Sequence, residues 1–293
     1  MTSTDNEIKI QKFFSILEKY ISGNTDKYFS NYKNIREIRI IVNKPMFMID
    51  NTGIVKTETK NITYENIRNI FSALCEYSVH TYKNEICEGF ITAEGGVRIG
   101  ICGTAVYENG TISNIKDISA LNIRIPHEFI GVSERITQLK NGGILIIGPP
   151  CSGKTTILRD YSRIVSKNKK LVVVDERTEI SGIYRGIPSF DIGYSFVLNG
   201  FNKSDGMKIA VRSLSPEVIV CDEFCDENDV LSAIYAMKSG AEIVASMHAF
   251  DKDEFVLKPV VKKFFEHKIF SHFVFLDKNF KIKEILGDKE VFV

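Results

Sequence analysis

Residues 148–156 have the residue types and the spacing of a phosphate-binding loop. They read G-P-P-C-S-G-K-T-T and match the pattern G-x-x-x-x-G-K-T. Glycines let such a loop bend around an anion, so that its N–H groups and the next helix N-terminus point at phosphates. The predicted nucleotide contacts are Gly148, Pro149, Pro150, Cys151, Ser152, Gly153, Lys154, Thr155 and Thr156. We expect Lys154 to act in catalysis by holding the β- and γ-phosphates, and the Thr155 hydroxyl to bind Mg²⁺.

The segments on either side of this loop are those that a phosphate site needs. The apolar run 144–147 precedes it and predicts a buried strand. The segment that follows, up to residue 165, has apolar residues at helical spacing. The order strand, loop, helix predicts a site for a nucleoside triphosphate, and the expected cofactors are ATP and Mg²⁺.

Acidic residues follow a second buried strand. Residues 171–174 are all apolar, as in a parallel strand that is buried on both faces. The acids that follow lie where α/β sheets bind their ligands, at the carboxyl end of a strand. We therefore predict that Asp175 and Glu176 contribute to a Mg²⁺ site and that Glu179 acts in catalysis. Capping of a helix N-terminus is the alternative role for each of these acids.

A further apolar strand followed by two acids occupies residues 218–223. This is the arrangement of a Walker B site, in which the strand fixes Asp222 to hold Mg²⁺. The next carboxylate, Glu223, can orient and polarise an attacking water. An adjacent glutamate favours hydrolysis over transfer to a second substrate, so Glu223 is predicted to be catalytic.

The next predicted strand, 243–247, ends at His248. A histidine at this edge of the sheet can hydrogen-bond the γ-phosphate or Glu223 and so report the state of the nucleotide. We therefore include His248 among the catalytic residues. A purely structural histidine is the alternative.

These strands and helices predict an α/β protein with a RecA-like P-loop ATPase domain at 141–293. Two further strands are expected at 272–276 and 281–285. Residues 1–140 predict a smaller α+β domain in which no catalytic spacing is found. Its expected elements are helices at 13–21 and 63–80, strands at 38–42, 47–49, 91–107 and 121–126, and a hairpin turn at Asn109-Gly110.

Composition excludes a strong general attraction to nucleic acid or to anionic membranes. The 293 residues carry 38 Lys and Arg against 37 Asp and Glu, a net charge of +1. The six cysteines are scattered rather than paired at metal-ligand spacing, so we expect neither zinc nor disulfides. The apolar runs are too short to span a bilayer, and residues 1–7 lack the features of a signal peptide. The sequence therefore predicts a cytoplasmic protein with no direct membrane span.

The chain resembles the stage III sporulation protein AA family, mother-cell ATPases of endospore-forming bacteria. That family is itself similar to the hexameric motors of type II and type IV secretion and of pilus retraction. The segments that carry the resemblance are GGVRIG at 95–100, LNIR at 121–124, the loop at 148–156, VVDERTEISG at 173–182, RSLSPEVI at 212–219 and ASMH at 245–248.

The resemblance implies roles for these segments and partners for the chain. Residues 175–179 fall at the Asp box of the secretion motors, Asp222-Glu223 at Walker B and His248 at the His box. Arg98 and Arg124 are implied to contact the nucleotide of a neighbouring subunit. The implied assembly is a homo-hexamer in the mother cell. It would power or assemble a channel to the forespore through membrane-embedded sporulation channel proteins, and would lie at the membrane through those partners.

One residue of the loop departs from the family pattern. Cys151 stands where the family usually has glycine, and a positive φ at this position would disfavour any other residue. Lower nucleotide affinity is the expected consequence.

Two other functions share the RecA-like core. A nucleic-acid-dependent translocase would use residues 167–170 or Lys262-Lys263 as phosphate contacts, but the near-zero net charge and the few aromatic residues nearby argue against nucleic acid as a partner. A non-hydrolysing ATP-gated scaffold would bind ATP without turnover.

Overall fold

The computed structural model describes residues 3–30, 32–50 and 52–291. The outermost residues of the two predicted domains, 1–2 and 292–293, lie outside the described residues. The chain divides into two compact units. Unit 1 comprises Met1–His127 and Gly182–Ser189, and unit 2 comprises Glu128–Ser181 and Phe190–Val293.

Unit 1 is built on a six-stranded sheet in which every neighbouring pair is antiparallel. The strand order is β3-β2-β1-β6-β5-β4. The strands are β1 Ile35–Ile41, β2 Phe47–Asp50, β3 Gly53–Lys56, β4 Phe90–Ala93, β5 Val97–Glu108 and β6 Thr111–Arg124. The α-helices are α1 Ser3–Tyr20, α2 Asp26–Phe29, α3 Tyr64–Leu74 and α4 Lys83–Cys87, with short 3-10 helices at Tyr32–Asn34, Val79–Tyr82 and Glu94–Gly96.

One hydrophobic core joins these helices to the sheet of unit 1. Apolar side chains of α1 and α3, such as Leu17 and Ile70, are fully buried together with Ile38 and Ile123 of the strands. The predicted helix at 63–80 is shorter than expected, because the chain leaves α3 at Leu74 and then takes positive φ angles at two successive residues. The predicted hairpin turn at Asn109-Gly110 is confirmed: both residues have positive φ, as a tight turn between β5 and β6 requires.

Side-chain contacts explain why Gly182–Ser189 groups with unit 1. The Tyr184 hydroxyl accepts a hydrogen bond of 3.2 Å from the Tyr82 hydroxyl and donates one to Glu76. The Arg185 guanidinium forms an ion pair with the same carboxylate. This stretch follows the predicted acidic segment directly in sequence.

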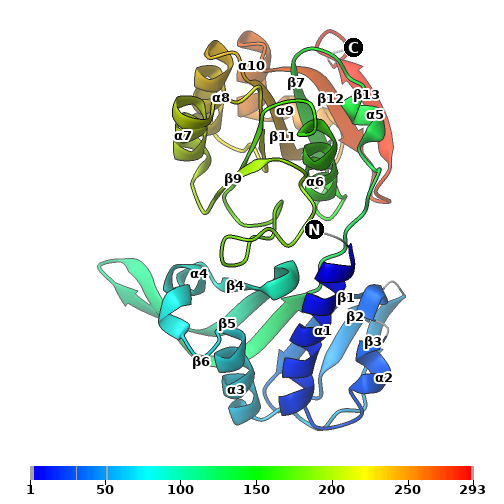
Figure 1. The fold of residues 1–293 in the computed structure, drawn as a ribbon, viewed down its shortest axis with the longest axis vertical. Coiled ribbons are helices and arrows are strands. Elements are labelled where there is room, and N and C mark those ends of the chain that lie inside the picture. The colour runs from blue at the N-terminus through cyan, green and yellow to red at the C-terminus, as the bar shows by residue number, and fades with distance from the viewer. Residues whose placement is uncertain (1–2, 31, 51, 292–293) are drawn as a thin grey trace. The chain divides into compact units, whose positions relative to one another are not determined.

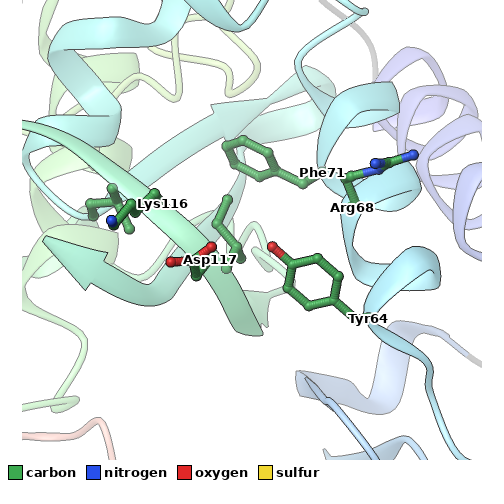
Figure 2. A pocket seen from close by; sticks show the side chains of 7 residues that line it. Tyr64, Arg68, Phe71, Lys116 and Asp117 are labelled. Carbon is green, nitrogen blue, oxygen red and sulfur yellow. The ribbon is translucent and has the colours of Figure 1, made fainter. Parts of the chain in front are cut away.

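Unit 1 contains a pocket of about 190 Å³ between α3 and β6. Figure 2 shows the Tyr64 hydroxyl directed toward Asp117, whereas the Arg68 side chain turns away. A bulge shapes β6 here: Cys102 pairs with Ala120 and Thr104 with Lys116, so Gly103 of β5 lies opposite residues 117–119 of β6. A Cβ on Gly103 would lie 2.6 Å from the Lys116 carbonyl oxygen. The lining residues are Tyr64, Arg68, Phe71, Ile115, Lys116, Asp117 and Ile118. None of them belongs to the predicted nucleotide site.

Unit 2 is built on a seven-stranded sheet of order β13-β12-β7-β11-β10-β8-β9 (Figure 1). Neighbouring strands are parallel except at the β12–β13 edge pair. The strands are β7 Gly143–Gly148, β8 Leu171–Asp175, β9 Phe196–Asn199, β10 Val218–Cys221, β11 Glu242–His248, β12 Phe270–Leu276 and β13 Ile282–Gly287. The helices are α5 Glu134–Thr137, α6 Lys154–Val165, α7 Lys203–Leu214, α8 Glu227–Lys238, α9 Lys252–Leu257 and α10 Pro259–Glu266.

Alternating side chains bury both faces of this sheet. Leu145 and Ile147 of β7 belong to one core with residues of α7, α8, α9 and α10. Ile144 and Ile146 face the other side and form a second core with α5 and α6. The result is a three-layer α/β/α unit. Of the described helices, α6 and the short α5 cover one face of the sheet, and α7, α8, α9 and α10 cover the other.

Three helices and one strand of unit 2 were absent from the elements expected from sequence: α7, α9, α10 and β9. In α7, Gly206 interrupts the helical pattern. It is needed there because a Cβ would lie 2.4 Å from Val174 Cγ1. Phe196 of β9 is 59% exposed at the edge of the sheet, so this strand lacks a buried apolar run. No described helix of the chain is both long enough and apolar enough to cross a membrane.

Candidate active site

The predicted phosphate loop connects β7 to α6 (Figure 1). Gly148 ends the strand, and a Cβ there would lie 2.5 Å from Ser152 Oγ and 3.0 Å from Leu276 Cβ. Gly153 is the N-cap of α6 with φ 89°. Because a glycine offers no side-chain acceptor, the first N–H groups of α6 are left for an anion. Thr155 and Thr156 lie in this first turn and are half-buried.

Cys151 adopts the positive φ that sequence analysis considered unfavourable for a residue other than glycine. Its φ is 60°, in the left-handed region that favours glycine, and the residue is exposed. The loop therefore accommodates cysteine in the conformation usual for glycine, at a conformational cost of about 1 kcal/mol.

Lys154 is turned into its own loop. Its Nζ donates hydrogen bonds to the carbonyl oxygens of Gly148 at 2.9 Å and Pro149 at 2.8 Å. Its third bond goes to Nδ1 of His248 at 2.8 Å. Burial lowers the pKa of Lys154 to about 8, against the opposing effect of the Glu223 carboxylate. A phosphate is the group that would replace these partners and restore full charge to this ammonium.

His248 joins Lys154 to Glu223. Because an ammonium only donates, Nδ1 of His248 must accept, and the ring proton lies on Nε2. Nε2 then donates to Glu223 Oε1 at 2.5 Å. Three of the four residues that sequence analysis predicted separately as catalytic thus form one continuous hydrogen-bonded chain.

The backbone of Glu223 is fixed by the neighbouring strand β11. The residue has φ 29°, which is unusual for a side chain of this size, and its N–H donates to Ser246 Oγ at 3.1 Å. Its Oε2 lies 3.5 Å from Arg177 Nη1. Glu223 therefore has both its main chain and its carboxylate held in place.

Strand register explains why Asp222 and Asp175 lie close together. Cys221 of β10 pairs with Val174 of β8, so the next residue on each strand is an aspartate at the same edge of the sheet. Both side chains continue the alternation of Val220 and thus turn to the α6 face. His248 lies four residues after Val244 on β11, so its side chain also turns to the α6 face.

Asp222 has the properties of an incomplete metal or water site. The residue is 3% exposed, and its buried Oδ2 has no hydrogen-bond partner among the described residues. Burial raises its pKa to about 7, helped by the charges of Asp175 and Glu179. The buried Ser152 Oγ of the loop is likewise unpartnered within the described residues. An orphaned carboxylate oxygen among other acids fits a divalent cation with its water shell.

Asp175 holds the loop that follows it. Oδ1 accepts the N–H groups of Glu179 at 2.9 Å and Ile180 at 3.2 Å, and Oδ2 accepts the Ser181 N–H at 2.8 Å. The Ser181 hydroxyl adds a fourth bond at 2.5 Å. The fully buried carboxylate thus organises the loop. Its contribution to a Mg²⁺ site stays a prediction.

Arg159 of α6 holds the same loop from its carbonyl side. Its Nε donates to the Ile180 carbonyl and its Nη2 to the Glu179 carbonyl, both at 2.9 Å. The guanidinium carbon lies 3.5 Å from the ring centroid of Phe190. Burial lowers the pKa of Arg159 to about 10, which still leaves it charged at neutral pH. Asp175 and Arg159 together fix Glu179 close enough for its charge to act on Asp222.

Three other predicted site residues have partners that sequence analysis did not anticipate. Glu176 Oε2 lies 2.9 Å from Lys203 Nζ of α7 and is drawn into that ion pair. Arg98 and Arg124 belong to unit 1, where they face each other across β5 and β6. The Arg98 guanidinium lies 4.0 Å from the ring centroid of Phe90.

Sequence analysis missed several residues that shape this site: Arg159, Arg177, Lys203 and Ser246. Two of them carried a signal in the sequence. Ser246 is the one hydroxyl within the apolar run 243–247, and Arg159 adjoins Leu158 on the buried stripe of α6. A polar residue within a buried pattern needs a specific partner.

Comparison with known proteins places the chain among sporulation proteins. The family described as "Sporulation stage III, protein AA" matches residues 7–290. Stage III sporulation protein AA of Bacillus subtilis (strain 168) is 34% identical over 255 residues, which cover 83% of each chain. The uncharacterized protein ycf45 of Cyanidium caldarium is 32% identical over 219 residues, covering 72% of this chain and 62% of that protein.

Solved structures share the fold at low sequence identity. The pilus retraction motor PilT, solved with bound ADP, has a TM-score of 0.58 at 14% identity and covers 86% of this chain and 77% of its own. The ATPase DotB of Legionella pneumophila has a TM-score of 0.54 at 16% identity and covers 84% and 73%. The expected RecA-like P-loop ATPase fold is thereby confirmed. The match over residues 7–290 and the identity to the Bacillus subtilis protein show that the chain belongs to the sporulation stage III protein AA family.

Proposed function

We propose that this chain is a Mg²⁺-dependent ATPase. One observation carries the proposal: Lys154 of the phosphate loop, His248 and Glu223 form a continuous hydrogen-bonded chain. A cation that binds phosphate is thereby linked to a carboxylate that can accept a proton from water. A carboxylate that is aligned to accept a proton is what hydrolysis needs, so we favour hydrolysis over the scaffold alternative.

Phosphate binding changes the partners of this chain. All three N–H donors of Lys154 are used by two loop carbonyls and His248, so a β–γ phosphate must displace at least one of them. Release of Nδ1 frees the His248 ring to turn. Glu223, which His248 holds by Oε1, then responds to the presence of the γ-phosphate.

Hydrolysis is assigned to Glu223 as the general base. The carboxylate takes a proton from the water whose oxygen attacks the γ-phosphorus, and the bond from that phosphorus to the β–γ bridging oxygen breaks. The products are ADP and phosphate. Lys154 and the N–H groups at the start of α6 hold the phosphates during the reaction.

Thr155 and Asp222 are the residues proposed to hold Mg²⁺. Asp222 fits because its Oδ2 is buried and unpartnered among the described residues. Mg²⁺ would supply positive charge to the β- and γ-phosphate oxygens. Asp175 and Glu179 complete the acidic surroundings through the loop that they share, and we propose that Glu176 takes part only after leaving Lys203.

Steady-state phosphate release tests the proposal. We expect the wild type to release phosphate from ATP with Mg²⁺ and to stop when EDTA is added. Glu223→Gln should lower kcat about 100- to 10,000-fold, and Lys154→Ala should abolish saturable turnover. Glu266→Gln, at an exposed position of α10, is the control. Equal phosphate release by all of these proteins would remove the assignment.

The cellular role follows from the family. We propose that the chain, with unit 1 and unit 2 as its two domains, acts as a homo-hexameric motor in the mother cell, where it powers or assembles the sporulation channel. Arg98 and Arg124 are proposed to reach the nucleotide of a neighbouring subunit. Mass in solution with and without ATP, compared between the wild type and an Arg98→Ala, Arg124→Ala double variant, tests ring formation and the role of these arginines. Strong stimulation of turnover by single-stranded DNA would instead support a nucleic-acid translocase.

A further inference from the structure

An exposed aromatic residue lies against the phosphate loop. Phe280 is 57% exposed, and a Cβ on Gly153 would lie only 3.1 Å from its Cδ1 atom. A large apolar ring that remains open to solvent next to a candidate ligand site is suited to contact a ligand. Gly153 is the residue whose lack of a side chain leaves room for this ring.

The turn that carries Phe280 holds the ring at this position. Asp277 Oδ1 accepts the N–H groups of Asn279 at 2.7 Å and Lys281 at 2.9 Å, and the Asp277 N–H donates to the Lys281 carbonyl at 2.9 Å. Phe280 itself has φ 63°, a conformation that is rare for an aromatic residue. The turn thus maintains an unfavourable backbone conformation that directs this ring to the loop.

Sheet order indicates which part of a nucleotide would meet Phe280. The loop strand β7 has β11 on one side and β12 on the other. The groups assigned to catalysis and to Mg²⁺ come from the β11 side: His248 ends β11, Asp222 and Glu223 follow β10, and Asp175 ends β8. A triphosphate whose γ-phosphate faces these groups has its nucleoside directed to the β12 side, where the turn after β12 carries Phe280.

We propose that Phe280 is the platform on which the nucleobase stacks, and that it makes the site prefer purines to pyrimidines. The proposal rests on the function proposed above and adds the residue that recognises the base. Stacking of a base on an aromatic ring needs no hydrogen bonds and is stronger for the larger purine ring system. The platform therefore accounts for affinity and for preference between bases by size, and it leaves the choice between adenine and guanine to other groups.

Equilibrium binding to two probes separates a contact with the base from a contact with the phosphates. The probes are ATP and inorganic tripolyphosphate, which has the phosphate chain but no base. We expect Phe280→Ala to weaken ATP binding about tenfold, because loss of one stacking contact typically weakens binding about 5- to 150-fold. Its affinity for tripolyphosphate should stay within about twofold of the wild type, as should the midpoint of thermal unfolding without ligand. Phe280→Tyr should bind both probes like the wild type.

A matched control lies at the opposite edge of the same sheet. Phe196 of β9 is 59% exposed, close to the value for Phe280, so Phe196→Ala removes a comparable ring far from β12 in the strand order. We expect this variant to bind both probes normally. The ratio of ATP to CTP affinity should fall in Phe280→Ala and remain unchanged in Phe196→Ala.

Three outcomes of these binding measurements test whether Phe280 stacks on the base. An ATP affinity within twofold of the wild type in Phe280→Ala overturns the platform. An equal loss for ATP and tripolyphosphate also overturns it, since Phe280 would then support the loop rather than the base. If the wild type binds neither probe, the proposed function fails together with this inference, whereas normal binding of tripolyphosphate shows that the phosphate site stands even when the platform does not.

Discussion

His248 Nε2 lies 2.5 Å from Glu223 Oε1, and the Nδ1 atom of the same ring accepts a hydrogen bond from Lys154 at 2.8 Å. The imidazole is thus oriented from both sides, with its proton placed between ring and carboxylate. This arrangement explains how a histidine that ends a neighbouring strand can align Glu223, the carboxylate that we propose as the general base.

Removal of this histidine should affect turnover more than binding. In His248→Ala, Glu223 loses its orienting donor, and we expect kcat to fall about 10- to 100-fold. The Kd for ATP should change less than about threefold, because the loop contacts remain. Steady-state kinetics and equilibrium binding measure the two quantities, and His267→Ala, at an exposed position, is the control. A parallel loss of binding and turnover would show that His248 acts on the phosphates instead.

Asp222 should make the stability of the nucleotide-free protein depend on pH. Its carboxyl has a pKa of about 7 in the folded protein, mainly because of burial, against 3.8 ordinarily. The folded state therefore holds this proton more tightly than the unfolded state, and Asp222 costs stability increasingly as pH rises from about 4 to 7. The difference corresponds to at most about 4 kcal/mol above pH 7.

The Asp222→Asn variant isolates this effect. In denaturant unfolding with EDTA and without nucleotide, we expect the variant to be more stable than the wild type at pH 8 and nearly equal to it at pH 4. Asp288→Asn, at an exposed position, should show no such dependence. A stability difference that is the same at both pH values would argue against a buried, unpaired carboxylate.

Substitutions at Cys151 should reveal its positive φ. Glycine relieves a strain of about 1 kcal/mol but adds a similar entropy to the unfolded chain, so Cys151→Gly should change the free energy of unfolding by less than about 1 kcal/mol. Cys151→Val places a β-branched residue at φ 60° and should destabilise the loop and weaken ATP binding. Thermal unfolding and ATP titration of the two variants check this. If the valine variant unfolds at the same temperature as the wild type and binds ATP with the same affinity, residue 151 does not have the positive φ described here.

The sequence predicted the strand ends of this site better than the contacts that their side chains make. An apolar run followed by acids located Asp175 and Asp222 at one edge of the sheet, because that pattern depends only on burial and chain direction. The sequence could not predict which of the two carboxylates would keep an oxygen without a hydrogen-bond partner among the described residues. That outcome depends on how the loop after β8 closes on its own N–H groups, and on Arg159 reaching it from α6. The Arg159 contact links residues 21 positions apart, and neither contact leaves a periodic pattern in the sequence.

The same reasoning applies to Glu176 and to Gly182–Ser189. Glu176 follows Asp175 and is predicted to share its role, and in the structure its carboxylate accepts a hydrogen bond from Lys203, a contact that the sequence does not indicate. The grouping of Gly182–Ser189 with unit 1 rests on Tyr184 and Arg185, whose partner Glu76 is more than 100 positions away in sequence. Neither contact has a local signature.

Arg159 should matter for both stability and catalysis, because it holds the loop that carries Glu179. Lysine cannot provide two parallel N–H donors for the carbonyls of Glu179 and Ile180, nor a flat surface for Phe190. Arg159→Lys should therefore lower the free energy of unfolding by about 2–4 kcal/mol and reduce kcat, while Arg135→Lys, at an exposed position of α5, should change neither. Denaturant unfolding and phosphate release measure the two effects. Full stability with reduced turnover would mean that Arg159 acts on the acids directly, whereas full activity and stability would show that Asp175 alone is enough to hold the loop.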